Sequence, residues 1–170
     1  VHYNLRDLHK RHAQVAKLVL LRLNDVLAGR PQNLKADDLT VEHLLPRKPG
    51  INSPWRALFP DPADRERCTE SLGNLVLVSK VQNDKAGNLD FARKREVLFG
   101  SGPHLPVNEF VSRQSQWTVQ EIETREAELL GLLHQIWQIG PPPARGGVAA
   151  VADEAIPPSK RRKERQAADA

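Results

Sequence analysis

The stretch Val41-Glu42-His43-Leu44-Leu45-Pro46 sets an acidic residue beside a histidine in a run that favours a short β-strand. Apolar and polar side chains alternate over about 40–45, and Pro46 ends the run because it has no amide proton for a sheet. Further on, Asn74-Leu75-Val76-Leu77-Val78 predicts a second strand. The next residues, Ser79-x-x-Gln82, form a capping box that begins a short helix. The order strand, strand, helix indicates a small ββα unit.

Helices are predicted on both sides of this unit. Apolar residues recur at helical spacing over about 5–28, and a second capping box, Thr118-x-x-Glu121, begins a helix over about 119–139. Asn88 is placed to cap a further helix that ends at Gly100. Between the strands, residues 46–71 hold five prolines, so we expect an irregular connection with at most a helical turn near 64–69.

The predicted fold class is therefore α+β and mainly α, with the ββα unit at about 40–99 packed between flanking helices. One domain over residues 1–140 accounts for all of these elements. Residues 141–170 are rich in proline and alanine and include the basic run 160–165. Because this segment has almost nothing to bury, we predict that it is disordered.

The composition excludes several classes of protein. Apolar runs are far shorter than the ~20 residues of a membrane span, and no leader-like segment opens the chain, so we expect a cytoplasmic protein and no membrane. The single cysteine, Cys68, excludes both a disulfide framework and a four-cysteine zinc site. The chain starts at Val1 and contains no methionine, which favours a fragment of a longer protein.

Glu42, His43 and Asn83 are the side chains with the chemistry to hydrolyse a phosphodiester. That reaction needs a base that titrates near neutral pH, which histidine provides. It also needs a hard cation, and hard cations prefer carboxylate and amide oxygens. Each residue has an ordinary structural interpretation as well: a histidine packed beside a strand, Asn74 in a turn, Asn88 as a helix cap.

The motifs together resemble a known family. They are Val41-Glu42-His43-Leu44-Leu45-Pro46, Leu72-Gly73-Asn74-Leu75, Asn83-Asp84-Lys85 with Asn88, and Phe91-x-x-Lys94. This series resembles the HNH, or His-Me finger, nuclease domain at the C-terminal end of GmrSD-type modification-dependent restriction enzymes. The similarity runs from about residue 17 to residue 139, and the spacing from Asn74 to Asn83 is similar to that in the HNH domain of RNA-guided CRISPR nucleases.

The resemblance implies a role for each residue. His43 would be the general base, Glu42 and Asn83 the metal ligands, and Asn74 the brace that orients His43. The expected metal is Mg²⁺, with Mn²⁺ as the alternative, and the expected partners are DNA and an N-terminal ParB-like nucleotide-hydrolysing domain. The basic residues expected to contact DNA phosphate are Lys80, Lys85, Arg93 and Lys94, although they could equally form a solvated helix face.

Strand geometry sets a condition on this site, because adjacent side chains of a regular strand point to opposite faces. Glu42 and His43 can reach one phosphate only at a bulge or at a strand end. In a regular strand, Glu42 would support the metal ligands without touching the metal. Two alternatives to a DNA endonuclease stay open. One is a DNA-binding or assembly module with a degenerate metal site, and the other is a nuclease that acts on RNA.

Overall fold

The computed structural model describes residues 13–100 and 102–137. The chain divides into two units, Val1–Gly140 and Pro141–Ala170, and every described residue belongs to the first. Helix α2 spans Ala13–Leu27, which covers the second part of the helix predicted over 5–28. Residues 5–12 of that prediction, and the predicted disordered tail 141–170, lie outside the described residues.

A β-hairpin connects the parts of the fold. Strand β1 (Leu39–His43) pairs antiparallel with β2 (Leu75–Ser79), and in this register Glu42 lies opposite Val76 and His43 opposite Leu75. Both strands were predicted, but β1 ends at His43 instead of residue 45. Strand β2 begins one residue late because Asn74 belongs to the 3₁₀ helix η3 (Leu72–Asn74).

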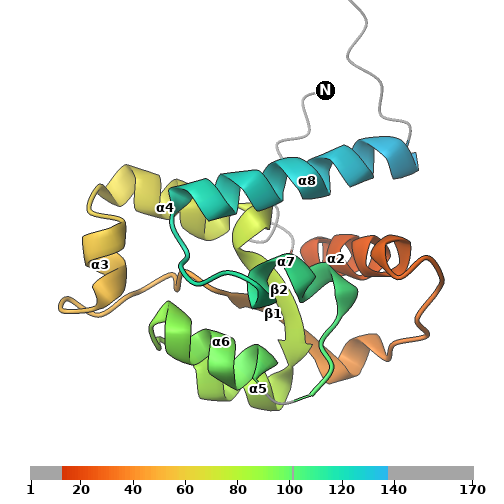
Figure 1. The fold of residues 1–170 in the computed structure, drawn as a ribbon, viewed down its shortest axis with the longest axis horizontal. Helices are drawn as coiled ribbons and strands as arrows, with labels where there is room; N and C mark the ends of the chain where they lie inside the picture. The colour runs from red at the N-terminus through yellow and green to blue at the C-terminus, as the bar shows by residue number, and fades with distance from the viewer. Residues whose placement is uncertain (1–12, 101, 138–170) are drawn as a thin grey trace, which may run out of the picture. The chain divides into compact units, whose positions relative to one another are not determined.

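The two faces of the hairpin contribute to different hydrophobic clusters among the described residues. Val76 and Val78 pack with Trp55 and Trp117, whereas Leu75 and Leu77 belong to a cluster that includes residues of α2 and α8 (Val119–Trp137). In Figure 1, α5 and α6 lie on one side of the hairpin and α2 lies on the other, while α8 crosses above the end of the hairpin that carries η3. The hairpin is therefore covered on both faces, as a small two-stranded sheet must be to remain stable.

Two short helices, α3 (Pro54–Leu58) and α4 (Pro62–Glu70), replace the predicted irregular connection between the strands. The proline count was misleading, because Pro54 and Pro62 are the first residues of these helices, where a missing amide proton costs nothing. The side chain of Asp61 accepts hydrogen bonds from the amides of Ala63 and Asp64. Trp55 is fully buried, so the connection forms part of the core.

Helix α5 (Lys80–Ala86) follows β2 directly and begins with the predicted Ser79–Gln82 capping box. Helix α6 (Phe91–Phe99) is capped by Asp90, whose carboxylate accepts a hydrogen bond from the Arg93 amide at 3.0 Å. The prediction that Asn88 caps this helix was therefore wrong. The helix starts two residues later than a cap at Asn88 requires, because Asp90 is the better placed acceptor.

The remaining described elements are short, apart from α8. They are the 3₁₀ helices η2 (Ala36–Asp38) and η4 (Pro106–Asn108), and α7 (Glu109–Ser112). The fold is mainly helical with a small antiparallel sheet, which confirms the predicted α+β class in outline. Within the described ranges, no helix has the length and apolar composition needed to cross a membrane.

Candidate active site

His43 is the last residue of β1, and its imidazole is turned toward the end of α4. The residue is 8% exposed, and its Nε2 atom lies 3.8 Å from Oε2 of Glu70. The chain leaves the strand immediately after it, and the Leu44 amide donates to the Asn74 carbonyl oxygen at 3.1 Å. His43 therefore lies where the hairpin, the end of α4 and η3 meet.

Glu70 and Arg47 complete a charged cluster with His43. The Arg47 guanidinium donates to both carboxylate oxygens of Glu70, from Nε at 2.8 Å and from Nη2 at 2.9 Å. The Glu70 side chain is 7% exposed, whereas that of Arg47 is 44% exposed. Sequence reasoning missed both residues because they lie in the proline-rich connection interpreted as irregular. The signal that could have revealed Glu70 is an acidic residue two positions before the Leu72-Gly73-Asn74 motif.

Asn74 joins the segments on either side of this cluster. Its side chain donates to the carbonyl oxygens of Leu45 and Thr69, each at 3.0 Å. Its Oδ1 atom accepts from the Leu45 amide at 2.8 Å and from the Trp117 indole at 3.1 Å. One buried amide thus fixes the chain two residues after His43 and one residue before Glu70. This is the geometry expected of a brace.

Arg125 supports the same region from α8. It is 1% exposed and donates to the carbonyl oxygens of Gly73 at 2.6 Å, Leu75 at 2.7 Å and Val107 at 2.9 Å. Burial lowers the pKa of its guanidinium to about 9, while Glu128 acts in the opposite direction. Two of these carbonyls, those of Gly73 and Leu75, flank Asn74, so Arg125 holds the backbone from which the Asn74 side chain projects.

Glu42 points to the other face of the hairpin, where it meets Lys94. The Lys94 ammonium forms an ion pair with the Glu42 carboxylate and donates to the His43 carbonyl oxygen at 2.7 Å. Lys94 is completely buried, and desolvation lowers the pKa of its amine while Glu42 opposes that shift. The prediction that Lys94 contacts DNA phosphate therefore has to be corrected, because its ammonium is buried and paired with Glu42.

Asn83 lies on the Glu42 side of the hairpin. Its side-chain amide approaches the Thr40 hydroxyl at 3.5 Å, and Thr40 and Glu42 share one face of β1 because they are two residues apart. The register of β1 runs without a bulge through Glu42 and His43. The structure therefore brings Asn83 to the face of Glu42 and places the His43 ring on the opposite face.

The oxygen atoms on this face suit a hard cation in kind, but they do not form a ready-made site. The one carboxylate, Glu42, already balances the charge of Lys94, so a cation would have to displace that ammonium. No group of three or more histidine, cysteine, aspartate or glutamate side chains in the described parts of the chain is arranged to hold a metal. The strand is regular at Glu42, which is the case in which Glu42 was expected to support the metal ligands without touching the metal.

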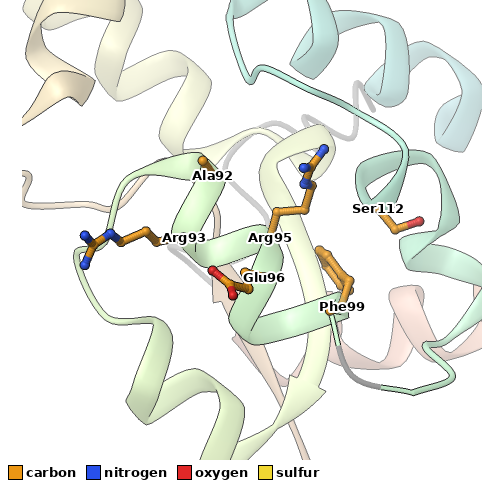
Figure 2. A pocket seen from close by; sticks show the side chains of 7 residues that line it. Ala92, Arg93, Arg95, Glu96, Phe99 and Ser112 are labelled. Atoms are coloured by element: carbon orange, nitrogen blue, oxygen red, sulfur yellow. The ribbon is translucent and has the colours of Figure 1, made fainter.

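The other predicted phosphate contacts are exposed. Lys80 and Lys85 lie at the two ends of α5, and Arg93 lies on α6. A hollow of about 470 Å³ lies beside α6. Figure 2 shows Arg95 and Ser112 among the side chains that line it, with Arg93 extending away from α6. The exposed basic residues of α5 and α6 form a cationic surface, although the same helices also expose Asp84 and Glu96. Asn88 is an exposed residue of the turn that joins the two helices.

Comparison with known proteins decides the family. A family model described as the C-terminal domain of GmrSD restriction endonucleases matches residues 2–132. The chain belongs to this family. A search of curated proteins gave no match, and neither did a search of solved structures. The matched range contains all of the candidate site residues, and membership of a GmrSD restriction endonuclease family supports a nuclease role in defence.

Proposed function

We propose that this domain is an HNH-type endonuclease that hydrolyses DNA phosphodiester bonds, with His43 as the general base. The observation that carries the proposal is that a GmrSD C-terminal domain holds a histidine at the end of β1, next to a buried carboxylate and an Asn74 brace. Strands β1 and β2 and helix α5 would be the ββα-metal unit of such an enzyme.

The chain's own residues suggest how hydrolysis would proceed. A neutral imidazole at His43 takes a proton from water, and the water oxygen then attacks phosphorus as the bond to the leaving oxygen breaks. Asn74 keeps the His43 backbone in place during this step through its bonds to Leu45. Lys80, Lys85 and Arg93 hold neighbouring phosphates by charge, which positions the duplex without reading its sequence.

We also propose that the reaction depends on a divalent cation, Mg²⁺ or Mn²⁺, which would neutralise charge on the phosphate when bound. Asn83 offers the amide oxygen, and Glu42 the carboxylate that supports it. The support for this proposal is the family resemblance and the type of these donors. The geometry adds no support, because the Glu42 carboxylate is paired with Lys94.

DNA recognition is proposed to belong to a partner. In the GmrSD family an N-terminal ParB-like nucleotide-hydrolysing domain would select modified DNA, and a cytoplasmic location is expected for such a system. The described residues offer the cationic surface of α5 and α6 for binding DNA through its phosphates.

One observation favours a second candidate. Because Lys94 neutralises Glu42 and the His43 ring lies on the opposite face of β1, the metal site could be degenerate and the domain could bind DNA without cutting it. Such a module would keep the cationic surface of α5 and α6 but would lack metal-dependent cleavage.

The two candidates are separated by incubating the purified chain with supercoiled plasmid in Mg²⁺, in Mn²⁺ and in excess chelator. The nuclease proposal expects nicked or linear product with either metal and none in chelator. Binding without cleavage under every condition would establish the second candidate. Parallel reactions with single-stranded DNA and with RNA decide the substrate, and cleavage of RNA alone would contradict a DNA endonuclease.

A further inference from the structure

The Glu70 carboxylate lies where a negative charge is unfavourable. It is the last residue of α4, where the helix dipole disfavours negative charge, and its side chain is only 7% exposed. A buried carboxylate is tolerated only with strong partners. Glu70 has one strong partner, the Arg47 guanidinium, which holds both oxygens, and the His43 ring lies beside it at 3.8 Å. The cluster therefore exists because of these three side chains together.

The backbone fixes the relation between Glu70 and His43. Asn74 bonds to Leu45 on one side and to Thr69 on the other, so a single side chain sets the separation of the two segments. The Leu44 amide adds a third link to the Asn74 carbonyl oxygen. Fixing both backbones in this way limits how far the imidazole and the carboxylate can move apart.

The cluster also borders the surface. A hollow of about 290 Å³ lies beside it. Its lining residues are Arg47, Lys48, Pro62, Arg65, Glu66, Thr69 and Glu70. The hollow is lined by three basic and two acidic residues, and the Arg47–Glu70 pair is part of its wall. Replacing such a pair by apolar residues often costs little stability, so stability alone gives no reason to keep it. A role in the chemistry of His43 explains the burial, the pairing and the position together.

We propose that Glu70 is a positioning residue that sets the ring orientation and the tautomer of His43, and that Arg47 holds Glu70 in place. The proposal rests on His43 being the general base. The 3.8 Å separation of Nε2 and Oε2 exceeds a hydrogen bond, but such contacts are often long before substrate binds and shorten afterwards. The carboxylate then accepts a hydrogen bond from the Nε2–H group, which keeps the proton on Nε2 and leaves Nδ1 as the nitrogen that takes the proton from water, as in other sites where a carboxylate fixes a functional histidine.

The test compares Glu70→Gln and Glu70→Asp with the wild-type chain and with His43→Ala. Glu123→Gln is the matched control, because it removes a carboxylate from another arginine pair, the exposed contact with Arg67. Steady-state cleavage gives kcat and KM, and ¹⁵N NMR of the histidine rings reports the tautomer of His43 without needing any activity. Glu70→Asp keeps the charge but shortens its reach, and it guards against a Gln variant that fails to fold.

We expect Glu70→Gln to lower kcat by about 10-fold to 100-fold with little change in KM, and to change the His43 ¹⁵N shifts. Glu70→Asp should recover part of kcat, and Glu123→Gln should match the wild type. Unchanged ¹⁵N shifts in folded Glu70 variants would overturn the proposal, even if His43→Ala is inactive. Full activity of His43→Ala would instead refute the proposed function, and the NMR result would still decide whether Glu70 orients the ring.

Discussion

Lys94 carries its charge inside the protein, where the ammonium meets the Glu42 carboxylate and the His43 carbonyl oxygen. Removing one partner of a buried pair leaves the other charge without compensation, which is far more costly than losing an exposed charge. Lys94 therefore contacts both the side chain of Glu42 and the backbone of His43.

Replacing this ammonium should destabilise the fold. We expect Lys94→Ala to lower the free energy of unfolding by about 3 kcal/mol, because Glu42 would stay buried without its cation. Lys85→Ala is the matched control, because it removes an exposed lysine, and it should change the free energy of unfolding by less than about 0.5 kcal/mol. Urea unfolding measures both, and equal stabilities would show that Lys94 is not a buried structural cation.

At the scale of the elements, the contact between η3 and α8 is the closest approach at the site. A Cβ atom added to Gly73 would lie 2.1 Å from the Ile122 carbonyl oxygen and 3.1 Å from the Glu126 Cβ atom. Backbone atoms of a long helix cannot move aside cheaply. Gly73 is therefore required for α8 to pack over the residues that carry Asn74.

Gly73→Ala should consequently destabilise the domain by at least about 2 kcal/mol, because η3 and α8 would have to separate. Gly131→Ala provides the control: Gly131 lies in α8 with no atom within 4 Å of an added Cβ, and alanine favours helix by ~0.5–1 kcal/mol. Thermal unfolding gives the melting temperature of each variant, which should fall for Gly73→Ala and stay the same or rise for Gly131→Ala. A Gly73→Ala protein that melts with the wild type would contradict the described packing.

Local patterns predicted the elements well wherever the signal lay within a few residues. The Ser79–Gln82 capping box and the hairpin strands are such cases, since each depends on neighbouring side chains. The failures came from competition between local signals: Asp90 took the cap expected of Asn88, and Pro54 and Pro62 began helices instead of preventing them.

For the whole molecule, the site depends on contacts between segments that are distant in sequence. Sequence order singled out His43 and Asn74 as candidates, but it could not show that α6 brings Lys94 to Glu42 or that α4 brings Glu70 to His43. Such contacts follow from packing of helices against the two faces of the hairpin. No periodicity or motif within one segment encodes them, which is why Lys94 was interpreted as a surface cation.

His43 as the general base is the central claim, and single-turnover cleavage of plasmid DNA by His43→Ala tests it most directly. His104→Ala is the control, because it removes a histidine that also contacts a carboxylate, Glu109, at 2.6 Å. We predict a rate loss of ~10²-fold or more for His43→Ala, unchanged DNA binding, and near wild-type cleavage by His104→Ala. Wild-type cleavage by a folded His43→Ala protein would contradict the account.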